Sequence, residues 1–233
     1  MELILEGIKQ AFLLLLHGDY NVIRVMILSL IVSGVATTIS LLIGIPFGSI
    51  LALNKFPGRR FVISLVNTGM GAPPVVVGLI VFIFLWRNGG PLGFLHILYT
   101  PVAMGIAQII IATPIVTGFT MATIQQLDPK LHLQILALGA SRTQMVWLLL
   151  KEARLPLLAA VMAGFGAVIS EVGASQMVGG NITGRTEILT TGIVGTVSTG
   201  DFAFAIALAV ILMILVYLVN LVLTTIQQRS KTR

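Results

Sequence analysis

The chain has 233 residues, of which 57% are hydrophobic and only 9% are charged. Soluble domains carry about 25% charged residues, so this composition excludes an ordinary soluble fold and indicates a multi-pass membrane protein. The net charge of +6 is collected in short segments between apolar runs, which disfavours nucleic acid as a partner. The chain contains no cysteine, so disulfide and thiol chemistry are excluded.

Residues 1–20 predict a helix that lies in the membrane interface and does not cross the bilayer. Glu2, Glu6, Lys9 and Gln10 gather on one face, and apolar side chains occupy the rest. A cleaved signal peptide is disfavoured because the segment starts with acidic residues and lacks a clean cleavage site.

Five apolar runs predict membrane-spanning helices, which need about 20 residues each. These runs are Val22–Leu53, Phe61–Trp86, Thr100–Thr123, Leu155–Val178 and Asp201–Ile226. The alternative is six spans, with the N-terminal segment inserted more deeply. In either case we expect an all-α polytopic membrane protein in which residues 1–233 form a single transmembrane domain.

Glycine and proline interrupt several of these runs. Pro46, between two glycines, predicts a bend in the first span. Gly71, Pro73 and Pro74 interrupt the second, and such backbone is tolerated where it is buried in protein or lines a cavity. We therefore place Pro73 and Pro74 in the wall or gate of a translocation pathway, with a static kink as the alternative. Residues 179–200 form a Gly/Thr-rich loop or re-entrant segment.

The longest polar interruption, residues 127–157, lies between the third and fourth spans. Its apolar spacing predicts a short amphipathic helix, a tight turn at Gly139 and a second helix with a basic end that stops near Pro156. A helical hairpin of this kind outside the membrane indicates docking to a soluble partner. We assign residues 125–154 to this loop.

The distribution of Lys and Arg predicts the orientation of the chain. By the positive-inside rule, the side with more basic residues is cytoplasmic. One side holds ten: Lys55, Arg59, Arg60, Lys130, Arg142, Lys151, Arg154, Arg229, Lys231 and Arg233. The other side holds four: Lys9, Arg24, Arg87 and Arg185. This places the hairpin in the cytoplasm and the N-terminus outside.

The hairpin resembles the cytoplasmic coupling loop of the membrane subunits of ABC importers. The family pattern is Glu-Ala-Ala, three residues, Gly, nine residues, an aliphatic residue, any residue, and Leu-Pro. Gly139 fits its centre, while residues 133–135 (Leu-Gln-Ile) replace Glu-Ala-Ala and Pro156 comes four residues late. The coupling residues that the resemblance implies are Gln134, Leu138, Gly139, Ala140, Ser141 and Arg142.

A second stretch resembles the oxyanion branch of these importers. Residues 170–174 (Ser-Glu-Val-Gly-Ala) and 179–186 (Gly-Gly-Asn-Ile-Thr-Gly-Arg-Thr) look most like the tungstate type, because Ser170 and Val172 replace the Gly and Phe of the molybdate pattern. The likeness covers roughly residues 25 to 225. It implies import of an oxyanion, tungstate first and molybdate or sulfate next.

The resemblance also implies partners and a location. These are a second copy of the chain, two cytoplasmic ATPase subunits that carry ATP and Mg, and an extracytoplasmic substrate-binding protein. The complex would lie in a bacterial or archaeal plasma membrane and work by ATP-driven alternating access. The substrate route would run along the interface between the two copies.

Polar residues near the fourth span are candidates for the route itself, because neutral donors replace water around an anion without holding it tightly. They are Ser170, Ser175, Gln176, Asn181 and Thr183. The alternative is bonding between helices. Glu171 is the only acidic residue in the interior of a predicted span; a carboxylate would repel an oxyanion, so we favour a structural role for it.

The sequence lacks the motifs of an enzyme. It has no Gly-x4-Gly-Lys phosphate loop, no clustered metal ligands and no assembled catalytic set, so ATP hydrolysis is expected on a partner and no cofactor or metal on this chain. A stand-alone channel or ion-coupled secondary transporter is the alternative from another class, and a membrane enzyme is a third. An ion-coupled transporter would predict more ionisable groups within the spans, or two related halves.

Overall fold

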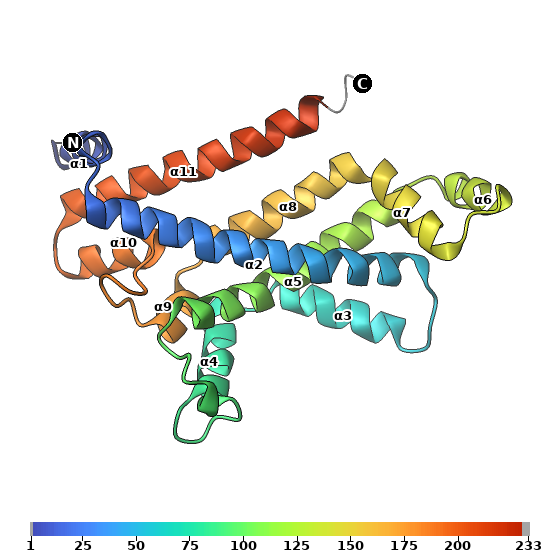
Figure 1. Ribbon diagram of the computed structural model, residues 1–233, viewed down its shortest axis with the longest axis horizontal. Coiled ribbons are helices and arrows are strands. Elements are labelled where there is room, and N and C mark those ends of the chain that lie inside the picture. The colour runs from blue at the N-terminus through green and yellow to red at the C-terminus, as the bar shows by residue number, and fades with distance from the viewer. Residues whose placement is uncertain (1, 230–233) are drawn as a thin grey trace.

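A computed structural model describes residues 2–229, and over this range the chain is all-helical, with no strand (Figure 1). Eleven α helices and one 3-10 turn follow one another. They are α1 Glu2–His17, α2 Tyr20–Leu53, α3 Arg59–Met70, α4 Pro74–Leu85, η1 Gly93–Leu95, α5 Pro101–Gln125, α6 Pro129–Ala137, α7 Arg142–Glu152, α8 Arg154–Ile169, α9 Gly173–Gly179, α10 Leu189–Ser198 and α11 Phe202–Arg229.

Helix α2 packs against α5, and small side chains make the contact close. The α2 residues Ser33, Ala36 and Ser40 are buried, and the Ser40 hydroxyl donates to the carbonyl of Ile109 at 3.3 Å. A Cβ on Gly48 would lie 2.6 Å from the Thr117 carbonyl oxygen. Small residues let membrane helices approach in this way, since lipid gives no hydrophobic drive for their association.

The predicted interruptions differ in their outcome. Helix α2 continues through Pro46 as one helix, so the predicted bend does not interrupt it. A proline removes only one helical hydrogen bond, so the helix can continue on both sides of it. The break at residues 71–73 is confirmed, but Phe61–Trp86 is not one straight span, because α4 turns by 101° from α3. Figure 1 shows α4 projecting from the bundle.

The fourth predicted span is also shorter than expected. Helix α8 ends at Ile169, and after a short break α9 carries the chain on to Gly179. The Gly/Thr-rich segment predicted as a loop or re-entrant segment contains a further helix, α10. Burial of Leu189 and Thr191 in α10 outweighs the low helix propensity of glycine and threonine.

Pro156 does not end the second hairpin helix as predicted. The break lies at Ala153, where α7 and α8 meet at 76°, and Pro156 stands in the first turn of α8. A proline is tolerated there because the first amides of a helix have no partner within the helix.

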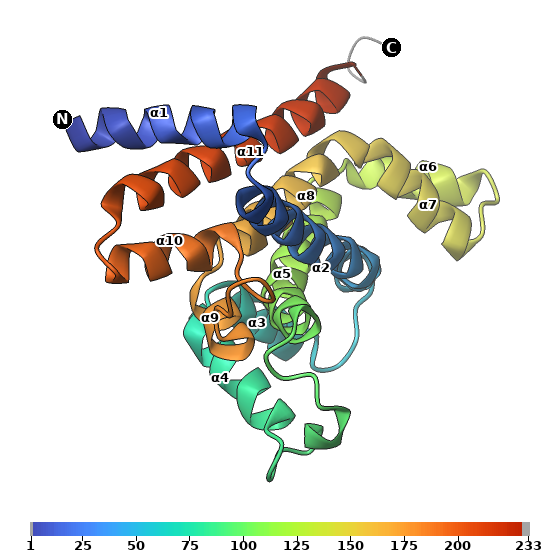
Figure 2. The same cartoon turned by 60° about the vertical axis from the view of Figure 1, so that its left-hand side comes forward.

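Helix α1 packs along α11 (Figure 2). The contact uses small residues: Ala11 is fully buried, and a Cβ on Gly7 would lie 2.6 Å from Ile206. Leu5, Phe12 and other apolar side chains of α1 remain exposed. At about 1.5 Å per residue, this 16-residue helix is too short to cross a bilayer, and its place in the interface stays a prediction.

By length and composition, α2, α5 and α11 are each long and apolar enough to cross a membrane. The bent pairs α3–α4 and α7–α8 raise the number to five if each is one span. Within the described residues the chain is therefore a multi-pass helical protein with up to five spans.

Candidate coupling hairpin and translocation pathway

The hairpin predicted between the third and fourth spans is formed by α6 and α7, and it has its own small core. Ile135 of α6 packs with Met145 and Leu149 of α7. Leu53, at the end of α2, is also packed against this cluster. The hairpin is thus seated on the end of the bundle and not free of it.

The turn of the hairpin has a defined geometry at each side. Gly139 adopts the left-handed conformation, with φ +81°, in the tight turn predicted there. Its amide donates to the Leu136 carbonyl at 3.0 Å and the Ala140 amide to the Ile135 carbonyl at 3.3 Å, the pattern of a Schellman motif. Ser141 then begins α7 with a capping box shared with Gln144.

Large apolar side chains of the hairpin face outward. Leu138 is 87% exposed, Leu133 is 68% exposed and Trp147 is 60% exposed. Of the other predicted coupling residues, Gln134, Ser141 and Arg142 are exposed and Ala140 is half-buried. Such a cluster of apolar residues outside the membrane-length helices is typical of a surface that a partner covers.

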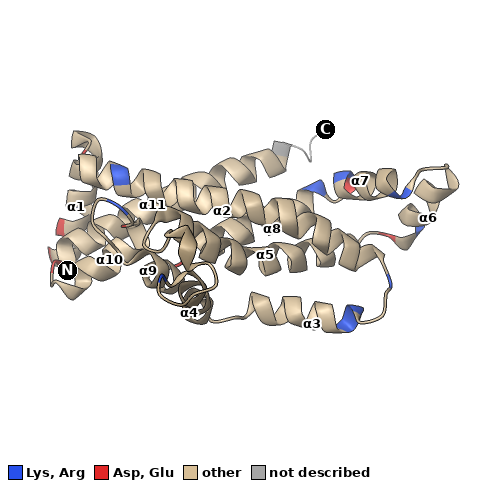
Figure 3. Cartoon of the chain, turned by 60° about the horizontal axis from the view of Figure 1, so that its bottom comes forward, with Lys and Arg blue, Asp and Glu red and all other residues tan. Residues whose placement is uncertain are grey.

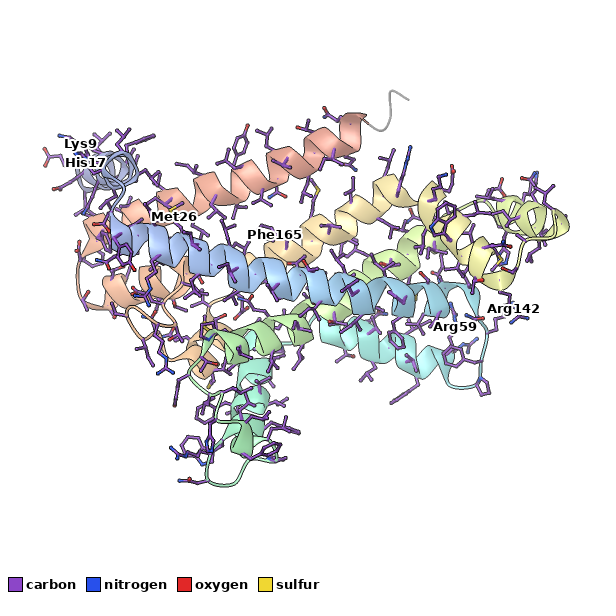
Figure 4. The ribbon with its side chains drawn as sticks, in the orientation of Figure 1. Lys9, His17, Met26, Arg59, Arg142 and Phe165 are labelled. Carbon is purple, nitrogen blue, oxygen red and sulfur yellow. The ribbon has the colours of Figure 1, made fainter. Side chains whose placement is uncertain are left out.

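Basic side chains gather at the same end of the molecule. Figure 3 shows Lys and Arg over α6, α7 and the start of α3. Figure 4 places Arg59 and Arg142 at this end and Lys9 and His17 at the opposite one. Arg59 also fixes the turn after α2, because its Nε donates to the Leu51 carbonyl at 2.8 Å. Lys151 lies over the Trp147 ring, 5.1 Å from the ring centre.

The predicted pathway residues fall into two groups, and the first lies where two helix breaks meet. A Cβ on Gly173, at the start of α9, would lie 2.6 Å from Val75, at the start of α4. The α3–α4 break, with Pro73 exposed and Pro74 at the first position of α4, therefore adjoins the α8–α9 break. Ser170 is exposed at that second break, and its hydroxyl donates to the Gly166 carbonyl at 2.7 Å.

Glu171 lies in the break between α8 and α9 and is 7% exposed. Its Oε1 accepts the backbone amide of Ala174 at 2.8 Å, in the first turn of α9. Its backbone carbonyl accepts the Thr190 hydroxyl at 2.9 Å, which ties the break to α10. These bonds fit the structural role that we predicted, and the role itself stays a prediction.

Ser175 is fully buried and does not line an open surface in this conformation. It accepts a hydrogen bond at 3.3 Å from the side-chain amide of Gln108 in α5, which is also fully buried. Gln108 Oε1 has no hydrogen-bond partner in the described part of the chain. Gln108 was not among the site residues predicted from the sequence. Its polar amide within an apolar span could have indicated a buried polar contact. Gln176, the next residue of α9, is exposed.

The second group, Asn181 and Thr183, lies beyond α9 in the loop that leads to α10. Asn181 is held at φ +47°, and its side-chain nitrogen lies 2.8 Å from where a Cβ on Gly195 would stand. Thr186 closes the loop, since its hydroxyl donates to the Gly179 carbonyl at 2.6 Å and accepts the Ile182 amide at 3.0 Å. Thr186 was part of the recognised motif, but its side chain was not predicted to hold the loop.

The fold is that of a multi-pass helical membrane protein with a helical hairpin at one end of its bundle. Residues 44–233 match the family described as binding-protein-dependent transport system inner membrane component, and the chain belongs to this family. The resemblance found in the sequence to the membrane subunits of ABC importers is thereby confirmed.

Three relatives match over nearly the whole chain. It is 37% identical to a tungstate uptake system permease protein of Peptoclostridium acidaminophilum, over 98% of this chain and 100% of the relative. It is 36% identical to a probable anion ABC transporter permease protein of Haloferax volcanii, over 93% and 96% of the two chains. A tungstate uptake permease of Campylobacter jejuni is 34% identical, over 95% and 92%.

A solved structure supports the fold independently of close sequence similarity. The crystal structure of an amino acid ABC transporter superposes with a TM-score of 0.68 at 19% identity, over 94% of this chain and 98% of that one. At this identity the match shows the shared fold alone.

Proposed function

We propose that this chain is the permease subunit of a tungstate importer, working as two copies with two ATPase subunits and an extracytoplasmic binding protein. The observation that carries the proposal is the full-length similarity to two proteins named tungstate uptake permeases. The exposed apolar residues of the α6–α7 hairpin support the ATPase as the soluble partner, because they need a covering surface. Molybdate and sulfate are the next candidate substrates.

The position of the hairpin supports a mechanism of alternating access. Helix α7 of the hairpin joins α8 at Ala153, at an angle of 76°, and α8 ends at the break that holds Glu171. That break adjoins the start of α4 at Val75. Movement of the hairpin, driven by ATP-dependent closure of the cassettes, would therefore reach both helix breaks through one rigid helix. Ser170, Pro73 and Pro74 would respond first.

Uptake by reconstituted complex tests the substrate and the class of transporter together. We expect tungstate uptake into proteoliposomes that contain this chain and its co-purified ATPase, with loaded binding protein outside and ATP inside. Uptake should fail with ADP, and excess molybdate should compete better than excess sulfate. Tungstate flux without ATP or binding protein would instead favour a channel. ATP-driven uptake of another anion, without uptake of tungstate, would show that tungstate is not the substrate.

Cysteine labelling tests the proposed orientation, with the N-terminus outside. The chain has no native cysteine, so every label reports an introduced site. His17→Cys and Asn88→Cys should react with an impermeant thiol reagent in intact cells, whereas Gly58→Cys and Ser141→Cys should react only after the membrane is opened. All four residues are exposed, so burial does not explain a missing label. Labelling of Ser141→Cys in intact cells would reverse the orientation.

A further inference from the structure

Two arginines from distant parts of the sequence line one cavity of about 320 Å³. Arg24 lies on α2, and Arg185 lies on the loop between α9 and α10. The rest of the lining comes from α2: Tyr20, Ile23, Ile27, Leu28 and Ile31. The cavity is thus cationic at one end and aliphatic along its length.

Both arginines are held in place by the backbone around them. The carbonyl of Ile182 accepts the Arg185 amide at 2.9 Å, within the loop that Thr186 closes. Gly184 has φ +77°, and a Cβ on it would lie 3.1 Å from Arg24 Nη1. The glycine at this position therefore gives the left-handed turn and leaves space for the Arg24 guanidinium against the loop.

Neither guanidinium is neutralised by the chain itself. Within residues 2–229 neither arginine makes an ion pair or a side-chain hydrogen bond. Asp19 accepts the amides of Asn21 and Val22, and Glu187 Oε1 lies beside Gly192. Both arginines are exposed, and two cations in one cavity without an ion-pair partner among the described residues fit an anionic ligand.

The depth of the pair along α2 matches the headgroup region of a bilayer. Helix α2 has 34 residues, about 51 Å at 1.5 Å per residue, whereas a bilayer with its headgroups is about 40–45 Å thick. Arg24 lies about one turn from the first residue of this helix. Leu53, at the far end, packs against the hairpin cluster. The arginine pair therefore lies at the end of α2 opposite the hairpin.

The aliphatic part of the cavity selects among anions. An inorganic oxyanion is polar on every side and gains nothing from Ile23, Ile27 and Ile31. A phospholipid joins an anionic head to an acyl chain, and the exposed face of α2 continues past Ile31 through Val35 and Leu42. We propose that Arg24 and Arg185 bind the headgroup of an anionic phospholipid, whose acyl chain lies along Ile27 and Ile31.

Lipid retention by the purified full-length chain tests this site. Native mass spectrometry would follow exchange of phosphatidylglycerol and phosphatidylcholine from mixed micelles. Each arginine near an anionic headgroup gives about a fivefold gain in affinity, so we expect about a 30-fold preference for phosphatidylglycerol in the wild type. Arg24→Gln/Arg185→Gln should bind both lipids equally within about twofold, and Arg24→Lys/Arg185→Lys should keep most of the preference.

Arg87→Gln is the matched control, because it removes one exposed arginine that lines a different cavity. It should leave the preference unchanged. If the double variant does not fold, Arg185→Gln alone, on an exposed loop residue, should lower the preference about fivefold. A wild-type preference in either glutamine variant would overturn the proposal. A second result would also overturn it: tungstate or inorganic phosphate binds only when both arginines are present, and phosphatidylglycerol does not displace it.

Discussion

Gly139→Asp is expected to lower ATP-driven uptake about 30-fold while the chain still inserts into the membrane. Gly139 ends α6 at φ +81°, beside the exposed Leu138. Aspartate would strain this turn and add a charge to a surface that we propose to be covered by the ATPase. Loss of a packed interface centre costs about 2 kcal/mol, which corresponds to this change. Uptake and ATPase activity of the reconstituted complex, with and without loaded binding protein, measure the effect.

Gly58→Asp separates docking from backbone strain. Gly58 also has φ +81°, and at both glycines an added Cβ would meet nothing within 4 Å. The two substitutions therefore impose a similar left-handed backbone strain, although an aspartate is favoured at Gly58, the N-cap of α3, and not at Gly139, just after the C-terminus of α6. We expect Gly58→Asp to leave uptake within about twofold of the wild type, because a surface substitution away from an interface has little effect. Equal loss in both variants, or wild-type uptake in Gly139→Asp, would show that the hairpin is not the coupling element.

The effect expected at Gly139 needs the partner. Small residues at this turn would press against the ATPase subunit, so an added side chain would collide there and not within the chain. Within the chain a Cβ on Gly139 has free space, so any collision needs a partner. The strain of the left-handed conformation is present in either case.

The two helices and the turn of the hairpin could be predicted from the sequence, because the residues that determine them are close to one another in the chain. The apolar spacing around Ile135 and Met145, the glycine turn and the serine cap each lie within one turn of the residues that they control. Of the two helix breaks only the first was predicted, because glycine and proline mark it locally; residues 155–178 were predicted as one span. Gly71 and Pro73 mark the first break, although nothing in their identity gives the 101° angle.

The contacts between distant segments could not be predicted in this way. The meeting of Gly173 with Val75 depends on how α4 and α9 cross, and the bond between Gln108 and Ser175 joins residues 67 positions apart. Pairing of Arg24 with Arg185 likewise requires the loop after α9 to fold back on α2. Polar residues in apolar runs indicated that some partner exists, but only the packing of the helices identifies it.

Burial also divides the residues that the sequence had grouped as one pathway. Ser170 and Gln176 are exposed. Ser175 of α9, which lies between them in the sequence, is fully buried against α5. Asn181 and Thr183 lie on the far side of α9 from the helix breaks. A route for an anion that uses both groups would have to pass along the length of α9. Their roles stay predictions, and Ser175 reaches a route only if α9 moves relative to α5.

Glu171→Ala is expected to cost about 1–2 kcal/mol of stability and to reduce uptake about 5- to 30-fold. The carboxylate is 7% exposed and accepts the Ala174 amide at 2.8 Å. Alanine would leave that amide without its partner at the break where α9 begins. Thermal unfolding of the purified chain and uptake by the complex would both show the loss. Glu6→Ala, on the exposed face of α1, should change neither measurement.

Glu171→Gln decides whether the hydrogen bond or the charge matters. Glutamine keeps a side-chain oxygen that can accept the Ala174 amide, and it removes the negative charge. If Glu171 holds the break together, as its bonds to Ala174 and Thr190 support, Glu171→Gln should retain uptake within about threefold and unfold near the wild-type temperature. If the charge takes part in transport, glutamine should reduce uptake at least as much as alanine does, while the stability remains near that of the wild type. That second result would contradict the structural role and favour a carboxylate that acts directly on the transported ion.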